Sequence, residues 1–380
     1  MSPVRPLRPL LLRVLPLLLS ALLAGCAAPA AQDGGEQDVR RAVAAWSRTP
    51  PAQLADVPLE DWTYEVSSVR RSGAAATVRA ELRYRLTGYD GAPAGSAREV
   101  RLSRDGGRWR VTGDRAAPGA PPQLWDQGPV TVVRGAHCLV LGVGQTSRTL
   151  SAVAEEADRA VPAASAARPG PWAGRVVVVV PASLERMAEL LGRPAAAYRG
   201  MGAVTTGRAG AAPAPADRVV VNPQGWAELS AAGRGIVLTH EVTHVATRAV
   251  TTDRTPLWLS EGFADWAAYR GGATTRQQAA PTLGRAVRRG ELPGGLPADG
   301  DFAFGGDQEA LARSYEGAWL ACRLIAQQWG DAALVRLYEH AGRDPLPVAL
   351  RDVLGVDEPA LTRAWQDSLR ADLGGPAPAP

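Results

Sequence analysis

The sequence predicts an α+β fold in two parts, a small N-terminal α+β domain and a larger domain with a mainly helical C-terminal lobe. Apolar and charged residues alternate without a break from Val78 to Leu86, which is typical of a strand with one solvated face. The five valines at 176–180 indicate a fully buried strand. From residue 232 onward the apolar spacing is mostly helical.

Residues 1–26 are expected to form a bacterial lipoprotein signal. Arginines precede a short apolar stretch at 14–23, which ends in the tetrapeptide Leu-Ala-Gly-Cys at residues 23–26, with small residues directly before the cysteine. This ending resembles the lipobox, in which the cysteine is acylated and becomes the mature N-terminus. The alternatives are an ordinary secretory signal with a coincidental cysteine, or a membrane-spanning helix, for which the apolar run is short. We expect an extracytoplasmic protein anchored to the cell membrane through lipid on Cys26.

Residues 27–36 are predicted to form a tether, and residues 37–116 the small domain. A helix is expected at 36–48, followed by strands at 78–86, 99–102 and 108–112, with a hairpin turn at 105–107. One helix followed by curved antiparallel strands is similar to small cone-shaped domains of the nuclear-transport-factor-like type. The domain contains no histidine, and its acidic residues alternate with arginine, so we expect no chemistry in it.

A Pro- and Ala-rich linker at 117–127 leads to the second domain, residues 128–372, and residues 373–380 are expected to be a disordered tail. The segment 195–215 is irregular in pattern. The expected strands are 130–133, 138–143, 176–180 and 218–221, and the expected helices are 147–161, 184–191, 232–249, 257–269, 308–329, 332–340 and 359–371.

The charge pattern argues against a nucleic-acid partner. The net charge is +4, every basic residue is an arginine, and the arginines are dispersed instead of forming a stripe with interleaved aromatics. Apart from Cys26, the chain has Cys138 and Cys322. In an oxidising compartment they could form a disulfide, or they could be two buried thiols, and the sequence leaves both open. The oligomeric state is equally open.

The pentapeptide His240-Glu241-Val242-Thr243-His244 carries the chemistry. Residues four apart lie on one face of a helix, so both imidazoles can reach one metal ion. Uncharged neighbours indicate a buried helix, where two unpaired imidazoles would be costly. Glu261, which opens the next helical pattern, is the expected third ligand. Two histidines and a carboxylate leave one zinc position open for water, so the sequence predicts a hydrolytic Zn²⁺ site.

The two motifs in order, the pentapeptide and then Glu261 within Trp-Leu-Ser-Glu-Gly-Phe-Ala-Asp-Trp, resemble those of gluzincin zinc metallopeptidases, and more narrowly of the peptidase-MA-like family. The resemblance covers roughly residues 128–340. It implies a gluzincin-type domain with a mixed sheet, in which the strand before the zinc helix, here 218–221, is a sheet edge along which extended substrate lies.

Glu241 cannot comfortably bind the same ion, and its position suits a general base that activates water; the alternative is an ion pair with a nearby arginine. The resemblance implies that Asp265 accepts a hydrogen bond from a zinc histidine, although it could simply be solvated. In the resembling family a tyrosine recurs near the position of Tyr315. This implies that the Tyr315 hydroxyl stabilises the oxyanion; the alternative is a tyrosine that only packs. His340 is a weaker candidate for that donor, and His137 is interpreted as structural.

Gluzincin aminopeptidases carry a Gly-x-Met-Glu-Asn strand whose glutamate holds the substrate amine. The comparable stretch from Arg199 to Val204 lacks that glutamate, which disfavours an aminopeptidase. The sequence therefore predicts a membrane-anchored endopeptidase that hydrolyses peptide bonds in peptides or proteins with zinc-activated water. The alternative is a non-catalytic, peptidase-like lipoprotein that binds a peptide or protein partner at the cell surface.

Overall fold

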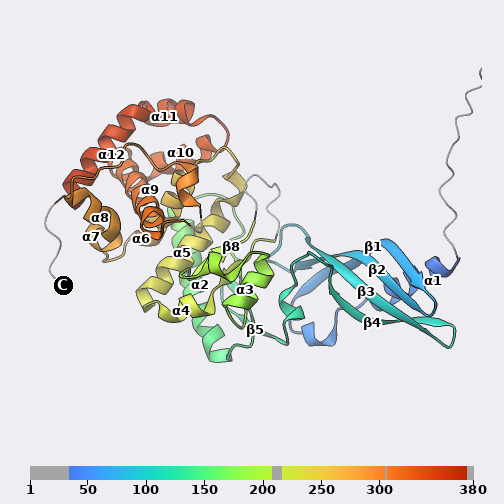
Figure 1. The fold of residues 1–380 in the computed structure, drawn as a ribbon. Coiled ribbons are helices and arrows are strands. Elements are labelled where there is room, and N and C mark those ends of the chain that lie inside the picture. The colour runs from blue at the N-terminus through green and yellow to red at the C-terminus, as the bar shows by residue number, and fades with distance from the viewer. Residues whose placement is uncertain (1–33, 208–215, 304–305, 375–380) are drawn as a thin grey trace, which may run out of the picture.

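The computed structural model describes residues 34–207, 216–303 and 306–374, and it confirms the α+β class. Figure 1 shows an extended antiparallel sheet in the N-terminal part, a second sheet in the middle and a helical C-terminal lobe. The expected lipidation site at Cys26 lies outside the described residues, as do most of the expected tether and tail. No helix within the described residues is long and apolar enough to cross a membrane.

The first sheet is an antiparallel meander with the strand order β1-β2-β3-β4. Its strands are β1 (Leu59–Ser72), β2 (Ala75–Leu86), β3 (Ala94–Asp105) and β4 (Arg108–Ala116). Helix α1 (Gly34–Trp46) packs on this sheet through Val39 and Val43, which are fully buried. Gly106 and Gly107 connect β3 to β4 with φ of +53° and +81°, which glycine adopts without steric cost, so the predicted hairpin turn is confirmed.

Two elements differ from the sequence pattern. The pattern does not reveal β1, because register shifts between Glu60 and Thr63 and between Val66 and Ser68 interrupt its alternation. Helix α2 (Ser147–Ala167) continues past the expected end at residue 161 and includes Pro162. Its buried stripe extends to the final turn, and this burial outweighs the hydrogen bond lost at proline.

The second sheet has the order β5-β6-β7-β9-β8 and is mixed, as expected. Its strands are β5 (Val130–Arg134), β6 (Cys138–Val143), β7 (Val176–Val180), β8 (Ala203–Thr205) and β9 (Val219–Val221). Strands β6, β7 and β9 run parallel, whereas β5 and β8 are antiparallel edges. The expectation that 218–221 forms a sheet edge is therefore wrong. Strand β9 pairs with a strand on each side, and the edge strand is β8, which lies inside the segment expected to be irregular.

Helices α2 and α5 (Ala231–Thr247) cover one face of this sheet, and α3 (Leu184–Leu191) covers the other. Residues from the N-terminal part, among them Leu54 and Leu86, share the core on the α3 side with Leu139 and Val177. The expected linker contains a short 3₁₀ helix, Leu124–Asp126, whose leucine is buried in the same core.

The C-terminal lobe is helical, as predicted. It consists of α6 (Leu257–Tyr269), α7 (Arg276–Ala279), α8 (Pro281–Arg288), α9 (Gln308–Trp329), α10 (Asp331–Ala341), α11 (Leu346–Leu354) and α12 (Glu358–Leu373). The lobe has its own hydrophobic core, centred on the packing of α6 against α9. Helix α6 also packs against α5, which brings the two predicted zinc helices together (Figure 1).

Candidate metal centre

Helix α5 presents both histidines of the pentapeptide toward α6. Ser230 begins the helix by accepting a hydrogen bond from the Gly233 N–H. Leu238 and Val242 are fully buried against α2 and the second sheet, which fixes the rotation of the helix about its axis. His240 and His244 consequently project from the other side, with their ring centroids 4.8 Å apart.

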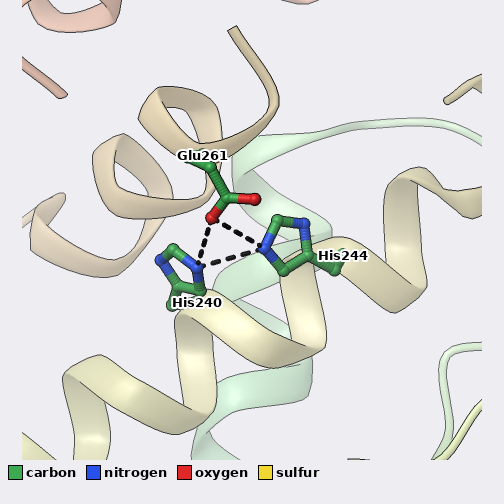
Figure 2. A group of neighbouring side chains, drawn as sticks. All are labelled: His240, His244 and Glu261. Atoms are coloured by element: carbon green, nitrogen blue, oxygen red, sulfur yellow. Dashed lines mark hydrogen bonds and ion pairs between the residues drawn. The ribbon is translucent and has the colours of Figure 1, made fainter. Parts of the chain in front are cut away.

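Glu261, on the second turn of α6, completes a group of three converging donor atoms (Figure 2). Its Oε2 lies 3.2 Å from Nε2 of His240 and 3.4 Å from Nε2 of His244. The two Nε2 atoms are 3.1 Å apart. The three side chains are 13 to 17% exposed, so the donors are shielded but reachable from outside.

These separations fit a single tetrahedral metal ion. Zinc–ligand bonds of roughly 2.0–2.2 Å in tetrahedral geometry place neighbouring donors roughly 3.3–3.5 Å apart. The observed range of 3.1 to 3.4 Å lies close to that expectation. The donor types, two imidazole nitrogens and one carboxylate oxygen, are also those of hydrolytic zinc sites. The residues present therefore fit zinc.

Asp265 orients one of the imidazoles. Its Oδ1 lies 2.8 Å from Nδ1 of His240, one turn of α6 after Glu261. With a proton on Nδ1 donated to Asp265, the Nε2 lone pair points toward the other donors. Burial lowers the pKa of His240, but Asp265 and Glu261 raise it well above its usual value. Burial likewise opposes ionisation of Glu261, but the two histidines hold its pKa below the usual range.

Glu241 lies beside the three donors and is not one of them. Its side chain is 9% exposed, and the Thr205 hydroxyl donates a hydrogen bond of 2.6 Å to its Oε2. Burial raises the pKa of Glu241, although His240 and His244 lower it. A carboxylate whose proton affinity is raised suits proton transfer near neutral pH. Among the described residues no arginine pairs with it, so the ion-pair alternative is not supported.

Tyr315, in the third turn of α9, lines the same cleft as the metal donors. Its ring packs edge-on against Phe302, and within the described ranges its hydroxyl makes no hydrogen bond. Burial and the nearby Glu261 raise the pKa of Tyr315, so the hydroxyl stays protonated and can donate. The other two histidines lie elsewhere: His137 precedes β6, and His340 is in the last turn of α10, and neither lines the cleft.

The cleft has a volume of about 950 Å³ and contains every predicted residue of the site. Its lining comes from the segment 196–207, from α5 and α6, from the connection at 251–255, and from α9. Edge strand β8 lies in the first of these segments, so an unpaired strand edge runs beside the metal donors. Such an edge can hydrogen-bond an extended peptide.

The loop before β8 carries a glycine, Gly202, in the stretch where the aminopeptidase glutamate is missing. Within the stretch from Arg199 to Val204, Gly202 lies close against neighbouring side chains. A Cβ atom there would stand 2.8 Å from Cδ1 of Leu229 and 3.2 Å from Cγ1 of Val237. A side chain at this position would require the side chains of Leu229 and Val237 to shift.

Sequence patterns did not identify Thr205. The residue belongs to a three-residue strand with small and apolar neighbours, and it is 36 positions from its partner Glu241. A strand this short carries no periodicity, so no local signal could have found the contact.

No family model matches this sequence, and no curated protein matches it either. Solved structures similar to the chain include those of M1 zinc metallopeptidases. A glutamate-to-alanine mutant from Deinococcus radiodurans matches with a TM-score of 0.35 and 17% identity, over 81% of this chain and 64% of that one. The same mutant bound to a Tyr-Ser-Ala substrate matches with a TM-score of 0.33 and 16% identity, over 81% and 63%.

A two-domain M1 zinc metallopeptidase mutant bound to L-arginine matches with a TM-score of 0.34 and 15% identity, over 73% of this chain and 60% of that one. This chain thus spans less than two thirds of the length of these structures. At these TM-scores the similarity supports no conclusion about activity, and the assignment of function depends on the geometry of the metal centre.

Proposed function

We propose that this protein is a zinc-dependent peptidase, anchored to the outside of the cell membrane by lipid on Cys26. The observation that carries the activity is the convergence of His240, His244 and Glu261 at tetrahedral spacing, beside the buried carboxylate of Glu241. The anchoring is supported by the sequence pattern that ends at Cys26.

The three donors would hold the ion, and Asp265 would keep the His240 ring in the required tautomer. Zinc held there would act as a Lewis acid, able to polarise water and a carbonyl group. Glu241 takes the proton from the attacking water and returns it to the leaving nitrogen. The Tyr315 hydroxyl donates to the carbonyl oxygen as negative charge develops there.

The cleft supports cleavage within a chain in preference to removal of an N-terminal residue. Its volume of about 950 Å³ accommodates several residues of an extended peptide along β8. The stretch from Arg199 to Val204 contains no carboxylate that could hold a free amine. The proposed activity is therefore that of an endopeptidase acting on extracytoplasmic peptides or proteins.

Metal content tests the centre first. The chain from residue 27 is purified as wild type and as four single variants, and bound zinc is measured by mass spectrometry. We expect about one zinc per chain in the wild type, with loss of zinc in His240→Ala and His244→Ala. The other two histidines provide matched controls, since His137→Ala and His340→Ala should keep the metal. Absence of zinc after reconstitution would refute the site.

Activity is then measured on peptide libraries, with Glu241→Gln as the inactive control that still binds zinc. Internal cleavage by the wild type alone supports the endopeptidase. A zinc-loaded wild type that binds peptides but never cleaves them supports the second candidate, a non-catalytic lipoprotein that binds a peptide or protein partner. Incorporation of labelled palmitate into the full chain, and its loss in Cys26→Ala, tests the anchor.

A further inference from the structure

Thr205 makes the contact that determines how the Glu241 carboxylate lies. The Thr205 Oγ1 atom is 2.6 Å from Oε2 of Glu241 and 3.0 Å from the backbone oxygen of the same residue. Among the described residues, no other side chain hydrogen-bonds that carboxylate. The contact joins the last residue of the edge strand to the zinc helix, across 36 positions of sequence.

The backbone that carries the Thr205 hydroxyl is fixed by pairing with β9. Thr205 pairs with Val219 of β9, and its neighbour Thr206 exchanges two hydrogen bonds with Arg218. The Thr206 N–H donates to the Arg218 oxygen at 2.7 Å, and the Arg218 N–H donates to Oγ1 of Thr206 at 2.9 Å. Because side chains alternate along a strand, Thr205 shares the α5 side of the sheet with buried Ala203.

The contact occupies only one of the two carboxylate oxygens. Oε2 accepts from Thr205, whereas Oε1 makes no hydrogen bond with any described residue and belongs to a side chain that lines the cleft. A glutamate side chain has three rotatable bonds, so a single fixed oxygen greatly restricts the position of the other. One oxygen is thus fixed, and the other is left available to the cleft.

We propose that Thr205 is a positioning residue, which fixes Glu241 through Oε2 and presents Oε1 to the water that attacks the substrate. This role rests on the proposed peptidase function. Strand β8 then has a second role besides binding peptide, because its last residue aligns the general base Glu241.

Two substitutions separate the hydroxyl from the rest of the side chain. Thr205→Val keeps the shape and removes the hydroxyl, and Thr205→Ser keeps the hydroxyl and removes the methyl group. Misplacement of a reacting group costs on the order of 10²-fold in rate, so we expect kcat of Thr205→Val to fall by about tenfold to a hundredfold. KM, zinc content and Tm should stay at wild-type values, and Thr205→Ser should recover most of kcat. Thr77→Val, in β2, is the control for the replacement of a strand threonine by valine away from the cleft.

A kcat for Thr205→Val within twofold of wild type would overturn the proposal. An equal loss in Thr205→Ser would do the same, since the methyl group would then be responsible. Loss of zinc or of thermal stability in Thr205→Val would also overturn it, because Thr205 would then have a structural role.

Crystal structures of the zinc-loaded proteins give a readout that does not require turnover. We expect one Glu241 rotamer in the wild type and in Thr205→Ser, and a displaced or multiple rotamer in Thr205→Val. An unchanged rotamer in the valine variant would refute the positioning role. A wild type without peptidase activity would refute the proposed function, and the rotamers would still decide the role of Thr205.

Discussion

Asp265 and His240 are joined by a 2.8 Å contact between Oδ1 and Nδ1, formed between the two helices that carry the metal donors. The contact links α6 to α5 and leaves Nε2 of His240 directed at the other donors. Removal of such a partner typically weakens metal binding by roughly 10- to 100-fold. We expect this loss of zinc affinity in Asp265→Ala, measured by competition with a chromophoric chelator at constant pH.

The matched control is Asp331→Ala, which removes an exposed aspartate paired with Arg270 on the same lobe. Its zinc affinity should equal that of the wild type. Unchanged affinity in Asp265→Ala would show that the ring is oriented by packing alone.

Tyr315 is expected to act on kcat and not on metal binding. Removal of one donor to the oxyanion costs on the order of 10²–10³ in kcat, and we expect Tyr315→Phe to show a loss of that order while it keeps one zinc. Tyr269 supplies the matched control, because it lines the same cleft and burial also raises its pKa, to about 12. Tyr269→Phe should retain activity. Equal kcat values for the two variants would assign Tyr315 a packing role only.

The pKa of Tyr315 also sets a pH expectation. Because burial raises this pKa, we expect the hydroxyl to remain protonated in mildly alkaline buffer. If the wild type loses activity in mildly alkaline buffer, the pH at which this loss occurs should therefore be the same in Tyr315→Phe. A shift of the alkaline limb in that variant would show that Tyr315 ionises in the working range.

The centre could be found from the sequence because its geometry is local. His240 and His244 are one helical turn apart, and Glu261 and Asp265 repeat that spacing on the next helix. The packing of α6 against α5 then brings the two faces together. The sequence positions of these residues therefore define most of the site before the tertiary fold is known.

The substrate side of the cleft could not be found in the same way. Strand β8 has three residues, so it shows no alternation of apolar and polar side chains. Strand β9 is expected at the edge only because it is the last strand before the zinc helix in the chain. The pairing of β8 outside β9 depends on long-range contacts such as that between Val204 and Val220. Thr205 emerges as a partner of Glu241 only once that pairing is formed.

Gly262, next to Glu261, is expected to be required for the approach of α6 to α9. A Cβ atom on Gly262 would lie 2.3 Å from the backbone oxygen of Ala318, and a backbone atom cannot move aside as a side chain can. Overpacking of this kind costs about 1–3 kcal/mol, and we expect Gly262→Ala to lose about that much unfolding free energy in urea. Gly295→Ala, where the added atom meets nothing within 4 Å, should be neutral. Equal stability of the two variants would contradict the close packing.

Cys138 and Cys322 should behave as two buried thiols, which answers a question that the sequence left open. Both are free and fully buried, Cys138 in the core beside α2 and Cys322 in the core of the helical lobe. Burial and Asp158 raise the pKa of Cys138 to about 12, and burial raises that of Cys322 well above its usual value. Thiol reagents attack the thiolate, and at pH 8 a thiol with that pKa is ionised in roughly one molecule in ten thousand.

We therefore expect no reaction of the native chain from residue 27 with a chromogenic disulfide reagent at pH 8. Two thiols per chain should appear when the protein is unfolded in denaturant without reductant. Because the raised pKa keeps both groups neutral, an increase from pH 7 to pH 9 should leave the native protein unreactive. Recovery of no thiols after unfolding would instead reveal a disulfide and would contradict the two free thiols, which lie in separate hydrophobic cores.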